Sequence, residues 1–285
     1  MTRTIAATLL AAALVLADPT ARAQDRDPDV AFVDLELVFA ADGSGSIDDD
    51  ELYFQRRSWG EALASEDVLS AIAQGMLGSI AVAYVEWGGP SSQVLVVDWR
   101  VIDGPESARA FADELMAAPR GAFGWNSISN AIDFSVRLVE ENAIEGTRRI
   151  IDVTADSGNR GGRPLAAARA DALAAGFTIN GLAISRPGGR PGLAGGMTLE
   201  DYFARELIGG PGAFVEIADA RRPFEVAARR KLLTEIAGAS DAPRRFAETH
   251  RRYSGRSEPS TMSEDRRTAP AWPEAPPSEP VERPW

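Results

Sequence analysis

The sequence contains no cysteine and only one histidine, His250, among its 285 residues. The lack of cysteine excludes disulfide bonds, a thiol nucleophile and a thiolate metal site. A single histidine excludes a zinc site that needs two imidazoles. Because His250 lies outside the segment expected to fold, a Ser-His-Asp triad is excluded from the folded body as well.

Basic residues are fewer than acidic ones. The sequence has 30 Lys and Arg and 42 Asp and Glu, so the formal net charge is −12. An acidic chain repels nucleic acid phosphates and anionic lipid head groups. We therefore expect no nucleic acid partner, and we expect cations and basic surfaces to be the favoured electrostatic partners.

Residues 1–23 predict a secretory signal peptide. Arg3 precedes an apolar stretch from Ile5 to Leu16, and "ARA" stands before Gln24. The apolar stretch is too short to span a bilayer comfortably, and no other segment could do so. We expect cleavage near Ala23–Gln24, a periplasmic or secreted mature chain and no stable membrane insertion. An uncleaved membrane anchor is the alternative.

Residues 239–285 are rich in Pro, Ser, Arg and Glu and poor in aliphatic side chains. Such a segment cannot bury enough apolar surface to offset its ordering entropy, so it predicts a disordered tail. The tail is a linker or docking segment, or a solvated end with no specific partner. Residues 24–238 are consistent with one α/β domain.

Strand-like and helix-like segments alternate through this domain, with a short loop containing "GGP" between two of the strands that predicts a hairpin. The pattern predicts a doubly wound, mainly parallel sheet with helices on both faces and one short antiparallel edge strand. The expected strands are 33–40, 79–87, 92–99, 148–156, 177–184 and 213–219. The expected helices are 48–65 with a continuation to Gly75, 104–118, 127–142, 163–176, 199–207 and 222–238.

The loop after the first strand, "DGSGS", places Asp42, Ser44 and Ser46 two residues apart. Alternate side chains of an extended turn point to one side, and Gly43 and Gly45 allow the backbone to fold tightly between them. A carboxylate and two hydroxyls are hard oxygen ligands that suit Mg²⁺ or Ca²⁺. A plain Gly/Ser turn, in which Asp42 bonds its own backbone, is the alternative.

Two later loops lie where ligands bind in such sheets, at strand ends and helix starts. Asp156 directly follows a buried strand, and Asn126 and Ser127 begin a helix, where one of them is free to face the site if the other is the N-cap. Asp152, inside the strand, predicts a buried structural carboxylate with a backbone or Arg partner. Trp125 either flanks a partner-binding surface or packs its loop against the core.

Other motif assignments fail on spacing. An EF-hand that begins at Asp42 would need Gly and Glu where the chain has Ile47 and Tyr53. The chain has no Gly-Lys-Ser/Thr of a phosphate-binding loop and no Gly-x-Ser-x-Gly around Ser44. The acidic run 48–51 favours a helix N-terminus over a second metal site.

Three segments, "DGSGS", "GWNSISNAI" and "IIDVTAD", resemble the metal-site loops of von Willebrand factor type A domains in order and rough spacing. "RRIIDVTAD", "TINGLAI" and "DYFARELIGGPGAF" resemble an uncharacterised bacterial group of exported proteins built on this domain. The resemblance covers roughly residues 30–238. It implies a metal-ion-dependent adhesion site with Asp42, Ser44, Ser46 and Asp156.

The family normally supplies a Thr from the middle loop, and this chain has Asn126 at the matching position. An Asn carbonyl oxygen can still ligate a hard cation, and Ser127 next to it is an alternative.

These features together predict an exported, non-enzymatic protein-binding module with Mg²⁺ as the expected cation and Mn²⁺ or Ca²⁺ as alternatives. In the family that the chain resembles, a partner carboxylate commonly completes the metal shell. A metal-dependent hydrolase, with a cation-bound water as nucleophile, is one alternative function. A scaffold whose site has lost its metal, as Asn126 would mark, is the other.

Overall fold

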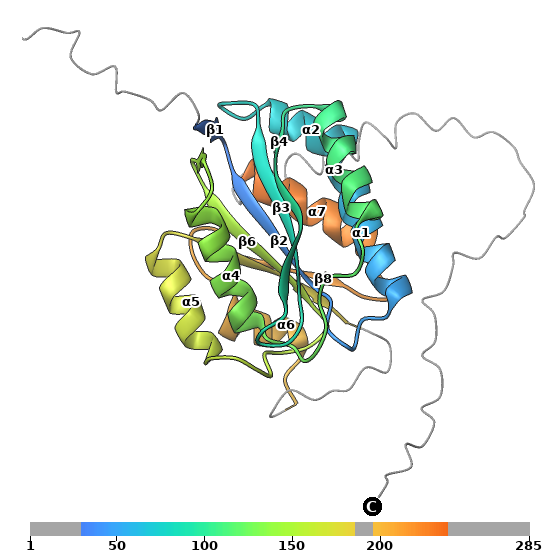
Figure 1. Ribbon diagram of the computed structural model, residues 1–285, viewed down its shortest axis with the longest axis vertical. Coiled ribbons are helices and arrows are strands. Elements are labelled where there is room, and N and C mark those ends of the chain that lie inside the picture. The colour runs from blue at the N-terminus through green and yellow to red at the C-terminus, as the bar shows by residue number, and fades with distance from the viewer. Residues whose placement is uncertain (1–29, 186–195, 239–285) are drawn as a thin grey trace, which may run out of the picture. The chain divides into compact units, whose positions relative to one another are not determined.

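A computed structural model describes residues 30–185 and 196–238 (Figure 1). All of them except Val30 belong to one compact unit that begins at Ala31. The predicted signal peptide and tail lie outside the described residues. Within the described part of the chain, no helix has the length and apolar character needed to cross a membrane.

Six strands form the central sheet, in the order β4-β3-β2-β6-β7-β8. Only β4 is antiparallel to its neighbour, and it lies at an edge, as expected, although its ten residues make it longer than predicted. The other strands run parallel, so the predicted mainly parallel sheet is confirmed. The strands are β2 (Glu36–Asp42), β3 (Ile80–Trp87), β4 (Gln93–Ile102), β6 (Arg149–Ala155), β7 (Thr178–Ile184) and β8 (Val215–Ala218).

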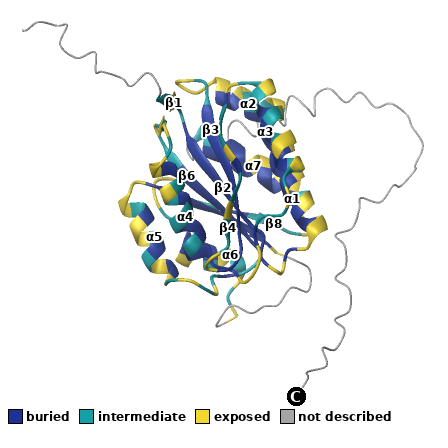
Figure 2. Ribbon diagram, viewed as in Figure 1, coloured by how far each residue is buried: buried dark blue, intermediate teal, exposed yellow. Residues whose placement is uncertain are grey.

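Helices cover both faces of this sheet, and Figure 2 shows buried strands between helices whose outer surfaces are exposed. Successive residues of β2 point to opposite faces, so that Phe39 joins the core on one side and Ala40 the core on the other. The first face holds α1 (Asp49–Leu63), α2 (Glu66–Ala73), α3 (Pro105–Ala117) and α7 (Phe224–Ala237), and the second holds α4 (Ile128–Glu140) and α5 (Leu165–Ala174).

The prediction of one strand over 33–40 was wrong. The chain bends at Asp34, whose carboxylate accepts hydrogen bonds from the backbone N–H groups of Leu77 (3.0 Å) and Gly78 (2.9 Å). The residues before the bend form β1 (Ala31–Val33), which pairs in parallel with β5 (Ile144–Gly146) in a separate two-stranded sheet. The short strand β5 was not predicted.

Two predicted helices are also divided. The first one breaks between α1 and α2, where the Ser65 hydroxyl donates to the Ala62 carbonyl (2.7 Å) and to Asp67 Oδ1 (2.8 Å). The segment 199–207 consists of a helical turn, α6 (Leu199–Tyr202), followed by the π-helical turn η1 (Phe203–Leu207).

Asp152 is fully buried, as predicted, but its partner is a lysine and not an arginine or the backbone. Lys231 Nζ of α7 lies 3.0 Å from Asp152 Oδ2 and also pairs with Glu235. Asn180 Nδ2 donates to Glu235 Oε1 (2.8 Å). Burial raises the pKa of Asp152 to about 8, against the opposing effect of the Lys231 charge.

Replacing Lys231 with methionine would leave two buried carboxylates without a cation. We expect Lys231→Met to lower the free energy of unfolding by about 3–5 kcal/mol in urea titrations. Arg57→Met is the matched control, because Arg57 is exposed and its ion pair with Glu61 spans 3.6 Å. The control should change stability by less than about 0.5 kcal/mol, and equal losses in the two variants would contradict the assignment.

Candidate metal site

Three loops meet at the carboxyl ends of the neighbouring parallel strands β2 and β6. The first site loop, residues 43–47, follows Asp42, the last residue of β2. The third site loop, residues 156–163, follows the end of β6, and the middle site loop, residues 118–127, leads from α3 to α4.

Asp42, Ser44 and Asn126 form the inner part of the candidate site. Asp42 Oδ1 accepts a hydrogen bond from the Ser44 backbone N–H (2.8 Å), and Asp42 Oδ2 accepts one from Asn126 Nδ2 (2.9 Å). The Ser44 hydroxyl donates to Asn126 Oδ1 (3.1 Å). All three side chains are buried. The alternative in which Asp42 bonds its own backbone is therefore present, and it coexists with the contact to Asn126.

Ser46 and Asp156 form the outer part. Ser46 Oγ lies 3.1 Å from Ser44 Oγ and donates to Asp156 Oδ1 (3.1 Å). Ser46 is exposed and Asp156 is partly exposed. The five predicted site residues thus form one chain of hydrogen bonds from the interior to the surface.

Ser127 does not belong to this cluster. Its hydroxyl donates to Asn130 Oδ1 (2.7 Å) and contacts the Gly161 carbonyl (3.1 Å). Ser127 thus occupies the N-cap position of α4 without a side-chain bond to the cap amides. Of the two neighbours considered for the middle loop, Asn126 is the one that reaches Asp42.

The oxygen atoms of this cluster fit a hard divalent cation. Two carboxylates, two hydroxyls and one amide oxygen come together, and no nitrogen or sulfur ligand is among them. Within the described residues, no group of three or more His, Cys, Asp or Glu side chains could hold a metal. A cation here would therefore depend on serine and asparagine oxygens in addition to the two carboxylates.

Burial and the nearby charge of Asp156 raise the pKa of Asp42 to about 7, although hydrogen bonds from Ser44 act in the opposite direction. The carboxyl group that lies deepest in the cluster therefore holds its proton more strongly than an exposed aspartate. A positive charge placed between the two carboxylates would relieve both effects.

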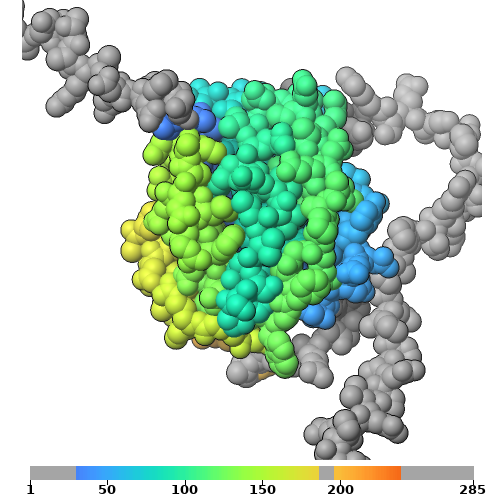
Figure 3. All heavy atoms as spheres, in the orientation of Figure 1, coloured from blue at the N-terminus to red at the C-terminus, as the bar shows by residue number. Residues whose placement is uncertain are grey.

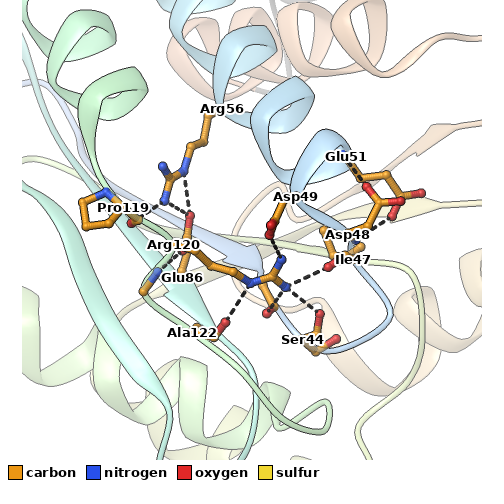
Figure 4. A network of polar contacts seen from close by, with 12 residues as sticks. Ser44, Ile47, Asp48, Asp49, Glu51, Arg56, Glu86, Pro119, Arg120 and Ala122 are labelled. Carbon is orange, nitrogen blue, oxygen red and sulfur yellow. Dashed lines mark hydrogen bonds and ion pairs between the residues drawn. The ribbon is translucent and has the colours of Figure 1, made fainter.

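Arg120 joins the middle loop to the first loop (Figure 4). Its Nη2 donates to the carbonyls of Gly43 (2.9 Å), Ser44 (3.1 Å) and Ile47 (2.7 Å). Its Nη1 forms an ion pair with Asp49 at the start of α1 (2.7 Å). One guanidinium thus holds most of the backbone of the loop that carries Ser44 and Ser46.

A buried ion pair fixes the segment that carries Arg120. Arg56 of α1 donates to Glu86 Oε1 of β3 through Nε (2.8 Å) and Nη2 (2.5 Å). Glu86 Oε2 accepts the backbone N–H of Gly121 (2.8 Å), and Arg56 also donates to the carbonyls of Ala118 and Pro119. These roles were not predicted. The available signal was Glu86, an acid within an otherwise apolar strand.

The acidic run 48–51 is the start of α1, as predicted. Asp48 Oδ1 accepts the Glu51 backbone N–H (2.8 Å), and Glu51 Oε2 accepts the Asp48 backbone N–H (3.1 Å). This reciprocal capping box fixes the end of the first loop.

The glycines that the loops need are not those predicted. Gly43 and Gly45 have no positive φ, and a Cβ there would come no closer than 3.4 Å to any atom. A Cβ at Gly88 would instead lie 2.2 Å from the Phe123 carbonyl oxygen, and Gly124 has φ +99°. Glycine is therefore required where the middle loop passes the end of β3.

The sheet and the helices on its two faces place the chain among proteins with the von Willebrand factor type A fold. The pilus adhesin SpaC from Lactobacillus rhamnosus GG, in its open conformation, is 13% identical with a TM-score of 0.50, over 75% of this chain and 30% of that chain. A von Willebrand factor type A protein from Catenulispora acidiphila is 15% identical (TM-score 0.47, 72% and 42% covered). Proximal thread matrix protein 1 from the mussel byssus, with a zinc-occupied MIDAS motif, is 14% identical (TM-score 0.45, 73% and 48% covered).

This chain spans less than half the length of each of those chains. No curated protein matches its sequence. The chain belongs to the family described as "Protein of unknown function (DUF1194)", whose model matches residues 32–240.

The raised pKa of Asp42 predicts a pH dependence of stability. At Asp42 the folded protein binds more protons than the unfolded chain between about pH 4 and pH 7, so the contribution of this group to the free energy of unfolding should fall as pH rises through this range. Asp42→Asn has no proton to lose, and we expect a shallower fall in EDTA-treated protein. Urea titrations across this range test the difference, and parallel pH profiles would contradict it.

The bonds of Arg120 predict a second outcome. Arg120→Ala would leave the carbonyls of Gly43, Ser44 and Ile47 without their side-chain donor, so backbone amides of the first loop should exchange faster with solvent. Hydrogen exchange followed by mass spectrometry measures this. Arg57→Ala is the control on the exposed side of α1, and it should leave that loop unchanged. Unaltered exchange in Arg120→Ala would show that the hydrogen bonds of Arg120 are not needed to hold the first loop.

Proposed function

We propose that the chain is an exported, non-enzymatic protein-binding module that holds a divalent cation at Asp42, Ser44, Ser46, Asn126 and Asp156. The observation that carries this proposal is the single chain of hydrogen bonds that brings these five oxygen-bearing side chains together where β2 and β6 end. Mg²⁺ is the cation we expect, with Mn²⁺ or Ca²⁺ as alternatives.

Each residue has a distinct task in this proposal. Asp42 supplies a buried negative charge, and Asp156 supplies a second one nearer the surface. Ser44 and Ser46 supply hydroxyl oxygens, and Asn126 supplies its amide oxygen. A cation held by these residues would supply Lewis-acid character for a carboxylate of a protein partner. Arg120 would hold the backbone of the first loop, whose two serine hydroxyls lie 3.1 Å apart.

The inner residues also support a second candidate, a scaffold without a metal. The Asn126 amide already satisfies Asp42 and Ser44 in the structure, because it donates to one and accepts from the other. An amide can therefore replace the cation as the partner of the buried carboxylate. In that case the domain would fold and bind its partner equally well in EDTA.

Calorimetric titration of Mg²⁺ and Mn²⁺ into the full chain after EDTA treatment distinguishes these candidates. We expect the wild type to release or absorb heat in a saturable way as it binds the cation, and we expect no such binding heat in Asp42→Ala. Binding should weaken below about pH 7, because the cation must displace the Asp42 proton. Asp98→Ala, which removes an exposed carboxylate of β4, should bind like the wild type. Equal binding heats in Asp42→Ala and wild type, or no saturable binding heat in either protein, would overturn the cation site and favour the scaffold.

A further inference from the structure

Two large aromatic side chains of the middle loop are exposed beside the candidate site. Trp125 is 75% exposed and Phe123 is 61% exposed, whereas Trp59 and Trp87 are buried in the core. Phe123 and Trp125 are called the aromatic rim below. The alternative in which Trp125 packs its loop against the core is therefore wrong.

The backbone that carries the aromatic rim is fixed on several sides. The Phe123 N–H donates to Ser92 Oγ (2.9 Å), and the Phe123 carbonyl accepts the Gly89 N–H (2.9 Å). The Phe123 ring lies 5.3 Å from the guanidinium carbon of Arg120, within range of a cation–π contact. The conformational entropy of this loop is already lost on folding. Binding of a partner to the rim therefore does not have to offset that entropy loss.

The rim and the candidate site share their backbone. Gly124, between the two aromatic residues, accepts the Gly45 N–H of the first loop (2.9 Å). Asn126, next to Trp125, contacts Asp42 and Ser44 through its side chain. In Figure 3 the green chain that follows α3 projects at the lower edge of the molecule.

The third site loop carries a positively charged residue, Arg160, whose backbone contacts the middle loop. The Arg160 backbone N–H donates to the Asn126 carbonyl (2.7 Å), and the Arg160 side chain is exposed. A divalent cation would offset the charges of Asp42 and Asp156, and Arg160 would then add a positive charge on a chain whose net charge is −12.

We propose that the partner is a protein segment in which an aspartate or glutamate stands directly beside a large apolar side chain. The carboxylate binds at the cation, and the apolar side chain packs against the aromatic rim. This inference rests on the proposed function, and it adds the aromatic rim as the feature that selects the partner. A cation alone accepts any exposed carboxylate, whereas a rigid aromatic pair at its side favours acids with an apolar neighbour.

An array of short immobilised peptides tests this proposal. Each peptide has a central Asp or Asn, flanked by Leu, Trp, Ser or Lys, and is probed with the full chain in Mg²⁺ and in EDTA. We expect binding only in Mg²⁺ and only to Asp peptides, about tenfold stronger beside Leu or Trp than beside Ser. Trp125→Ser should remove this preference and leave Mg²⁺ binding, measured by calorimetry, unchanged. Met76→Ser is the matched control. Met76 is 89% exposed and precedes the N-terminal end of β3, whereas the middle loop passes the C-terminal end of that strand.

The outcomes separate the two proposals. Wild-type binding by Trp125→Ser, no effect of the neighbouring residue, or no peptide bound by Mg²⁺-loaded protein would overturn the role of the rim and leave the cation site standing. No Mg²⁺ binding in calorimetry would overturn both. If the wild type self-associates in sedimentation and Trp125→Ser does not, the rim joins copies of this chain, and the peptide partner is wrong.

Discussion

The geometry of the candidate site depends on the buried ion pair between Arg56 and Glu86. Both charges lie out of solvent, so each needs a full set of partners, and they find them in the backbone of residues 118–121. That requirement fixes the segment between α3 and α4. Arg120 projects from it and bonds the first loop. The middle and first site loops thus take their relative positions from one pair of side chains on α1 and β3.

Two buried aspartates on neighbouring strands illustrate different uses of the same residue. Asp152 points into the core face that α7 covers and has Lys231 as its counter-charge. Asp42 forms no ion pair with any described residue, and its partners are the amide of Asn126 and the backbone of Ser44. The first carboxylate has a cation within the fold, which it shares with Glu235. The second keeps its need for a positive charge, and the nearby Asp156 increases that need.

Local patterns predicted the parts of the site that depend on local geometry. Asp42, Ser44 and Asp156 lie at or just after the ends of apolar runs typical of buried strands, and parallel strands bring their ends together. The role of Arg120 could not be predicted, because the first-loop carbonyls that it bonds lie more than 70 residues away and an arginine in a loop has no periodicity. The strands β1 and β5 are too short to produce a pattern. The exposure of Trp125 depends on which atoms already fill the core beneath it.

Gly88 and Trp125 differ in how freely they can change. A methyl group at position 88 would collide with the Phe123 carbonyl and displace the middle loop, so the framework restricts this position to glycine. Trp125 faces solvent, and its replacement leaves the backbone bonds of Gly124 and Asn126 intact. The middle loop therefore contains one position that the packing restricts and one that can vary without disturbing the fold. Under the proposed role of the rim, chains with the same loop framework would acquire new partners by exchanging the exposed aromatic residues alone.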